Sequence, residues 1–159
     1  MVSNKSVDQW FAEYGASHQN PINKAIHWCC VPGIFLVIVG LIWALPVPEV
    51  MRSMGSWLNW ATLIAIPVVI FYWMLSARLA IGLTLFTLSC LALVSWYESL
   101  QLAPLWATSL VLFVLLWIGQ FIGHHIEGKK PSFFQDVQFL LIGPAWLMGF
   151  IYRRLGLSY

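Results

Sequence analysis

The run WCCVPGIFLVIVGLIWALPV, residues 28–47, contains no charged side chain and decides the class of protein to which the chain belongs. A helix of about 20 apolar residues is long enough to cross the hydrocarbon core of a bilayer. Four such windows occur, at Trp28–Val47, Trp57–Leu75, Leu79–Tyr97 and Pro104–Gly123. The 159 residues are 60% hydrophobic and 9% charged, which lies outside the usual composition of soluble domains. The sequence therefore predicts an integral membrane protein.

The connections between these windows are short, so we expect consecutive helices to be antiparallel neighbours. A fifth apolar stretch, VQFLLIGPAWLMGFIYRR at 137–154, is shorter and carries Gly143-Pro144 at its centre. It either crosses the membrane or lies at its surface. The predicted fold is an all-α membrane bundle of four transmembrane helices plus a C-terminal re-entrant or interfacial helical segment. It forms a single domain over residues 1–159, with the spans at 28–123.

Lysine and arginine near span ends prefer the cytoplasmic side of a membrane. With four spans, Arg52 alone falls on one side, and seven basic residues fall on the other, namely Lys5, Lys24, Arg78, Lys129, Lys130, Arg153 and Arg154. If the last stretch also spans, Arg153 and Arg154 change sides, and the basic residues are distributed five against three between the two sides. The sequence therefore favours four spans with both termini in the cytoplasm.

Other classes of site find little support. Cys29, Cys30 and Cys90 have neither a disulfide framework nor a zinc-type spacing, and we interpret them as apolar filler. The net charge of +2 is too small and too dispersed to indicate nucleic-acid binding.

All four histidines lie in two pairs that flank the spans. His18 and His27 come just before the first span, and His124 and His125 come just after the fourth. An even number of spans places both pairs on the same side of the membrane, where the first and last helices of a small bundle are close. We expect the pairs to converge on one metal ion. Sharing an ion requires ligand atoms no more than about two coordination bonds of 2 Å apart.

Local signals support this convergence. Asn20 is a good N-cap and Pro21 suits the first position of a helix, so His27 is expected about two turns into that helix and His18 in the turn before it. His124 and Glu127 are three residues apart and share a helix face, whereas His125 points about 100° away. Gly128 is a plausible C-cap. Ser132 and Gln135 form a possible capping box for the final segment.

The charged residues beside the second pair allow two interpretations each. Glu127 is either a solvated carboxylate at a helix end or a support that orients a ligand histidine. Lys129 and Lys130 are either topology determinants or an anchor for an anionic head group.

Imidazole ligands suit zinc, copper, iron and nickel, so the histidines alone do not name the metal. An incomplete shell leaves open positions, which are typical of catalysis. The HExxH motif of zinc hydrolases is absent. A metal at the interface, with apolar helices beneath it, fits a lipid whose polar head reaches the metal while its tail lies along the bundle. A carboxylate with an adjacent hydroxyl would bind such a metal through both oxygens.

Two motifs resemble signatures of the Mpo-type 2-hydroxy fatty acid dioxygenases, a family of small membrane proteins. YGASHQNPINKAIHWCCVPG is similar to Y-x-x-x-H-x-N-P-x-N-x-x-x-H-x-x-x-x-P, and QFIGHHIEGKKP is similar to Q-F-x-G-H followed by an acidic residue, a basic pair and proline. The resemblance covers about residues 11–146. Family members include a fungal endoplasmic-reticulum enzyme that converts phytosphingosine-derived 2-hydroxy fatty acids to odd-chain acids.

The resemblance implies an iron(II)-dependent dioxygenase that shortens a 2-hydroxy fatty acid by one carbon with release of carbon dioxide. It implies that His18, His27, His124 and His125 hold Fe(2+) as the catalytic centre. The doubled histidine leaves open which of that pair is the ligand. It also implies that Asn20 and Asn23 shape the first turn of the helix. From the residues themselves we expect a supporting role for Glu127 and contact of the substrate carboxylate with Lys129 and Lys130. The partners are then the fatty acid, molecular oxygen and membrane lipid, in a bacterial inner membrane or the endoplasmic reticulum.

Two other functions compete with this hypothesis. One is a non-enzymatic haem- or metal-binding membrane subunit with His27 and His124 as axial ligands. The other is a structural or lipid-binding bundle in which the histidines have no chemical role. Di-iron desaturases are a poor match, because their sites need about twice as many histidines.

Overall fold

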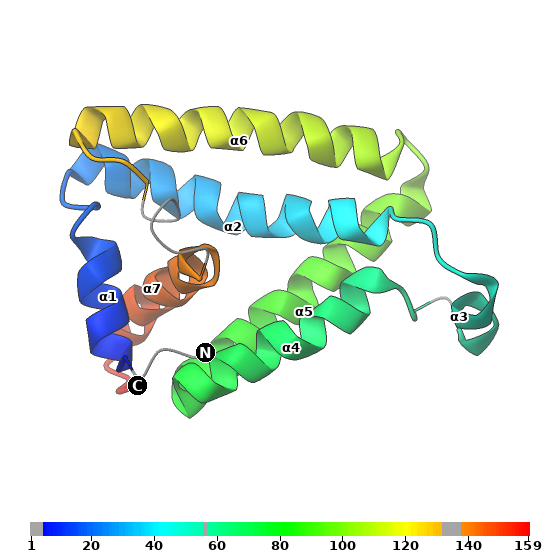
Figure 1. Cartoon of the computed structure of the whole chain (residues 1–159), viewed down its shortest axis with the longest axis horizontal. Coiled ribbons are helices and arrows are strands. Elements are labelled where there is room, and N and C mark those ends of the chain that lie inside the picture. The colour runs from blue at the N-terminus through cyan, green and yellow to red at the C-terminus, as the bar shows by residue number, and fades with distance from the viewer. Residues whose placement is uncertain (1–4, 56, 132–137) are drawn as a thin grey trace.

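The computed structural model describes residues 5–55, 57–131 and 138–159. These residues form helices and no strands (Figure 1), as the sequence predicted. The helices are α1 (Val7–Gly15), α2 (Pro21–Trp43), α3 (Glu49–Met54), α4 (Trp60–Leu75), α5 (Ala77–Leu100), α6 (Leu105–Glu127) and α7 (Phe139–Arg154).

The long helices form two antiparallel pairs that meet at an angle. α2 and α6 lie side by side along their whole length, and α4 and α5 form the second pair (Figure 1). The pairs meet near the C-terminal end of α2 and diverge toward its N-terminal end. α7 and α1 occupy the open end, where α7 contacts α1, α2 and α5. The bundle is therefore a wedge closed by α7.

Local sequence signals explain where α2 and α6 begin and end. The side chain of Asn20 accepts hydrogen bonds from the backbone N–H groups of Ile22 and Asn23, with Pro21 in the first turn, so the predicted N-cap is confirmed. Gly128 ends α6 with a φ of 71°, a left-handed conformation that glycine adopts at little cost, which confirms the predicted C-cap. The capping box predicted at Ser132 and Gln135 lies outside the described residues.

Small residues let α2 and α6 approach closely. A Cβ atom built on Gly123 would lie 2.4 Å from Oδ1 of Asn23, and one built on Gly40 would lie 2.4 Å from Oγ of Ser109. Both distances are far below van der Waals contact. Close packing through small residues is typical of helix pairs in membranes, where lipid contacts provide no hydrophobic drive for association.

Among the described residues, three helices are long and apolar enough to cross a membrane: α2, α5 and α6. α4 is also apolar but has only 16 residues, so the predicted second span corresponds to a shorter helix. α6 exposes a row of large apolar side chains that includes Val111, Leu115 and Ile122. In contrast, α7 buries Ile142, Ala145, Leu147 and several other side chains in the core that it forms with α1, α4 and α5. The final segment is therefore one helix packed mainly against protein.

Candidate metal centre

Three of the four histidines meet at the open end of the wedge. His18 lies in the turn between α1 and α2, His27 two turns into α2, and His124 in the last turn of α6. Their exposed fractions are 1%, 1% and 4%. Ring centroids are 4.3 Å apart for His18 and His27, 5.0 Å for His18 and His124, and 4.9 Å for His27 and His124. The two motifs converge as the sequence predicted.

Backbone carbonyls orient two of these rings. Nδ1 of His18 lies 2.5 Å from the carbonyl oxygen of Tyr14, and Nδ1 of His27 lies 2.9 Å from that of Asn23. A carbonyl oxygen only accepts, so each Nδ1 carries the proton and each Nε2 keeps a lone pair. Histidine ligands of metals usually donate their other ring N–H in this way, which sets the tautomer and the ring orientation.

Two ring nitrogens of the cluster are buried without a hydrogen-bond partner: Nε2 of His18 and Nδ1 of His124. An unpaired buried polar atom is costly, and nearly all such atoms in native proteins are paired. A histidine that served only to fill the core would be expected to satisfy both nitrogens. Unpaired nitrogens on neighbouring rings fit a cation that binds between them.

Burial keeps His18 in the form that binds metals. Burial, and to a smaller extent the nearby His27, lowers the pKa of His18 to about 3. The ring is therefore neutral near pH 7, and neutral imidazole is the ligand form.

One potential ligand atom from each of the three histidines lies within 4.8 Å of the other two. Two bonds of about 2.1 Å join nitrogens at most roughly 4.2 Å apart, and three nitrogens around one ion lie closer together than that, so the rings would have to move inward to share an ion. Among the described residues, this group has the ligand types and spacing to hold a metal ion. Three protein ligands leave further positions open, as in catalytic metal sites.

Glu127 joins the two histidine motifs without touching a ring nitrogen. Its carboxylate accepts hydrogen bonds from the backbone N–H groups of Gln19 and Asn20, both at 2.8 Å, and from Nδ2 of Asn23 at 3.1 Å. The turn that carries His18 is thereby tied to the end of α6. Glu127 thus contacts the backbone beside the histidines, and does not orient a ring directly.

Asn23 connects the same parts from inside. It is fully buried, and its Nδ2 donates to the carbonyl oxygen of Ser17 as well as to Glu127. Its own carbonyl accepts from His27. Both asparagines of the motif therefore act on the first turn of α2, Asn20 as its cap and Asn23 as a bridge between the turn, α6 and His27.

The structure separates the remaining predicted residues from the cluster. His125 is exposed and is not part of the three-histidine group. Lys129 donates from Nζ to the carbonyl oxygen of Ala16 at 2.6 Å, so it holds the end of α1. Lys130 is exposed, and neither lysine lines the cavity beside the histidines.

Sequence reasoning assigned no role to Tyr14 and Gln120, which flank the cluster. The ring of Tyr14 stacks on His18 with centroids 4.2 Å apart. Burial raises the pKa of Tyr14 well above its usual value, so its hydroxyl remains a hydrogen-bond donor. Gln120 is buried and lines the cavity beside His27. Each lies four residues before a histidine of the cluster, a spacing that is visible in the sequence and that places Gln120 and His124 on the same face of α6.

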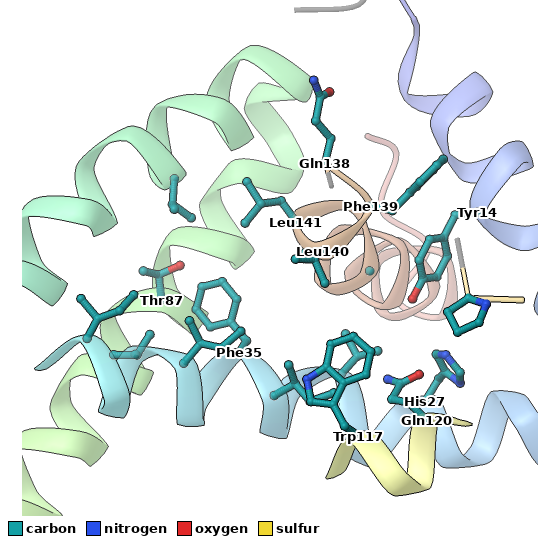
Figure 2. A pocket seen from close by; sticks show the side chains of 18 of the residues that line it. Tyr14, His27, Phe35, Thr87, Trp117, Gln120, Gln138, Phe139, Leu140 and Leu141 are labelled. Carbon is teal, nitrogen blue, oxygen red and sulfur yellow. The ribbon is translucent and has the colours of Figure 1, made fainter. Parts of the chain in front are cut away.

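A cavity of about 380 Å³ opens beside the histidines and extends along α2. Its volume is in the range of small-molecule sites. Figure 2 shows Tyr14, His27 and Gln120 at one end and Phe35 and Thr87 toward the other. Side chains of α2, α4 and α7 provide most of the cavity's lining. The candidate metal centre therefore has access to a long apolar space.

Comparison with protein families identifies one match, and it covers nearly the whole chain. The family model described as "2-hydroxy-palmitic acid dioxygenase Mpo1-like" matches residues 4–155. The chain therefore belongs to the Mpo1-like family. No curated protein and no solved structure matches it.

Proposed function

We propose that this Mpo1-like family member is an iron(II)-dependent dioxygenase that converts a 2-hydroxy fatty acid to the acid one carbon shorter, with release of carbon dioxide. The observation that carries the proposal is the cluster of three buried histidines, two of which have unpaired ring nitrogens, at the end of an apolar cavity. The family description supplies the substrate class and the type of reaction.

We propose that His18, His27 and His124 hold the metal. Neutral imidazole, together with the hydrogen bonds that Nδ1 of His18 and Nδ1 of His27 donate, suits a divalent transition metal. Iron(II) held there would supply the one-electron chemistry that allows oxygen to react with an organic acid. His125, which the family resemblance also implied as a ligand, is not needed for this site, because it lies outside the cluster.

The overall reaction needs no additional reductant. R–CH(OH)–COOH and O₂ give R–COOH, CO₂ and H₂O, so atoms balance and the substrate itself supplies all four electrons that oxygen accepts. The bond between C1 and C2 breaks, C1 leaves as carbon dioxide, and C2 becomes the new carboxyl carbon. The chain therefore requires no binding site for a sacrificial acid.

Tyr14 and Gln120 are placed to receive the polar end of the substrate. Both line the cavity beside the histidines, and the tyrosine hydroxyl remains a donor because of its raised pKa. We propose that they hydrogen-bond the carboxylate or the 2-hydroxyl and hold it at the cluster. Lys129 and Lys130 lie outside the cavity, and we assign them to anchoring this end of the bundle at the membrane surface.

The topology belongs to the same proposal. With α2, α4, α5 and α6 as spans, both histidine motifs lie on one side of the membrane, and the distribution of lysine and arginine places that side in the cytoplasm. A bacterial inner membrane and the endoplasmic reticulum both fit this arrangement.

A haem-binding subunit is less well supported. The rings of His27 and His124 are 4.9 Å apart and both contact His18, so a porphyrin between them would have to displace the third ring. An optical spectrum of the purified protein distinguishes the alternatives, because haem would show a Soret band and the proposed iron(II) centre would not.

The decisive test is metal analysis and turnover of the detergent-purified protein. We expect bound iron, conversion of 2-hydroxypalmitate to pentadecanoate in air, and release of one carbon dioxide per oxygen consumed. Palmitate, which lacks the hydroxyl, is the control and should not react. Protein that binds no iron, or that stays inert with 2-hydroxypalmitate, iron(II) and oxygen, would overturn the proposal.

A further inference from the structure

The cavity beside the histidines is longer and more apolar than the polar end of a 2-hydroxy acid requires. We infer that it holds the acyl chain of the substrate, and that Ala61 and Ala65 of α4 at its far end limit the chain length that the protein accepts. This inference rests on the proposed function for the substrate class. It adds to that function the position of the acyl chain and the residues that limit its length.

The cavity follows one face of α2. His27, Ile34, Ile38 and Ile42 line it, and they recur at spacings that keep side chains on the same side of a helix. At a rise of 1.5 Å per residue, His27 and Ile42 lie roughly 22 Å apart along the axis. One leaflet of a bilayer is about 15 Å deep, which is the depth that a lipid acyl chain fills. The cavity is therefore long enough for a long-chain acid whose polar end is at the histidines.

The polarity of the cavity changes along its length. At the histidine end, the hydroxyl of Tyr14 and the amide of Gln120 supply polar atoms. Toward the other end the lining is mainly apolar, and the hydroxyl of Thr87 donates to the carbonyl oxygen of Leu83 at 2.8 Å. Thr87 is buried, and with its hydroxyl already bonded it offers little to a polar ligand (Figure 2). A ligand with one polar end and an apolar tail matches this order.

The far end of the cavity lies where α4 approaches the C-terminal part of α2 (Figure 1). α4 contributes two alanines there, Ala61 and Ala65, one turn apart on the same face. The small side chains leave the space that the end of an acyl chain would use. A phenylalanine at either position would fill it and would shorten the cavity from the end opposite the histidines.

The test compares chain-length preference in Ala65→Phe and Ala61→Phe with the unmodified protein. The matched control is Ala92→Phe, because Ala92 of α5 is exposed and does not line the cavity. Turnover of 2-hydroxyoctanoate, 2-hydroxydodecanoate and 2-hydroxypalmitate would be measured, together with equilibrium binding of the same acids without oxygen. One excluded methylene changes selectivity by about 10-fold or more. We expect kcat/KM for 2-hydroxyoctanoate, divided by kcat/KM for 2-hydroxypalmitate, to rise at least about tenfold in the cavity variants. The same ratio should stay unchanged in Ala92→Phe.

The outcomes separate this inference from the function on which it rests. Ala65→Phe protein with unchanged iron content and thermal unfolding, but with the unmodified chain-length profile, would overturn the inference while the proposed function stands. If the unmodified protein turns over none of the acids, the proposed function fails. Binding of the acids without oxygen then tests whether the cavity holds an acyl chain. Loss of 2-hydroxypalmitate binding in Ala65→Phe with retention of 2-hydroxyoctanoate supports the acyl site, and equal binding by both proteins overturns it. Ala65→Leu serves as the milder variant if phenylalanine prevents folding.

Discussion

The two ends of the paired helices α2 and α6 both carry polar side chains, but they use them differently. At one end, three histidines, Asn23 and Gln120 are buried together. At the other, the polar groups lie around the exposed helix α3 and connect loops. Nε1 of Trp43 donates to Glu98 at 2.6 Å, and Nε1 of Trp60 donates to the carbonyl oxygen of Pro46 at 2.9 Å.

The two ends differ in whether their buried polar atoms have hydrogen-bond partners. Near α3, Asn59 accepts the N–H groups that begin α4, and Glu49 and Arg52 form an exposed ion pair at 3.9 Å. Among the described side chains at that end, no buried nitrogen or oxygen lacks a hydrogen-bond partner. At the histidine end, Nε2 of His18 and Nδ1 of His124 are buried and lack a hydrogen-bond partner. Polar groups that satisfy one another hold loops in place, whereas unpaired buried groups that face one another indicate a site for a ligand.

The largest effect is expected from removing a ring of the cluster. His18→Ala, His27→Ala and His124→Ala should each lose bound metal and lower turnover by more than about a hundredfold, beyond the loss typical of residues that only orient ligands. His125→Ala is the matched control, because the exposed His125 should retain metal and activity. Metal content and turnover measured on the same samples check this prediction. Equal losses in all four variants would show that His125 belongs to the site.

A smaller effect is expected from the carboxylate that joins the two histidine motifs. Glu127→Gln places an amide NH₂ where the backbone N–H groups of Gln19 and Asn20 now donate to a carboxylate. The turn that carries His18 should loosen, and metal affinity should fall by about 10- to 100-fold. Glu98→Gln is the corresponding change at the other end and should leave metal affinity unchanged. Titration with iron(II) under nitrogen measures both, and equal affinities for the two variants would contradict the role assigned to Glu127.

The smallest effect concerns packing, and it separates stability from metal binding. Gly123→Ala and Gly40→Ala each place a Cβ atom 2.4 Å from a side-chain oxygen across the interface of α2 and α6. Both should lower the free energy of unfolding by about 1–3 kcal/mol. Only Gly123→Ala should also weaken metal binding, because it displaces Asn23, which orients His27. Unfolding in detergent, followed by tryptophan fluorescence, and metal titration distinguish the two, and weakened binding in Gly40→Ala would contradict this expectation.

Several parts of the site could be predicted because they depend on nearby residues. The break at Asn20-Pro21 places His18 before α2 and His27 within it, and Gly128 ends α6 just after His124. The expectation that both motifs lie at the same end of the first and last long helices agrees with the meeting of His18, His27 and His124. These signals act between residues that are close in the sequence, so they can be identified without the tertiary structure.

Other parts depend on contacts that no local pattern specifies. Glu127 binds the backbone of residues more than a hundred positions away, and the carboxylate alone was equally compatible with solvent. Lys129 donates to the backbone at the end of α1, whereas its charge alone was equally compatible with a topology determinant and an anchor for an anionic head group. The burial of α7 and the exposure of His125 likewise follow from packing.

From the sequence alone, the all-α class, the apolar segments and the two histidine motifs could be identified, because apolar length and capping are properties of neighbouring residues. Only the tertiary structure decided which three rings meet, which of their nitrogens lack a partner and how far the cavity extends toward Ala61. Those properties arise where helices distant in the chain pack against each other, and the space between them is set by the side chains of both.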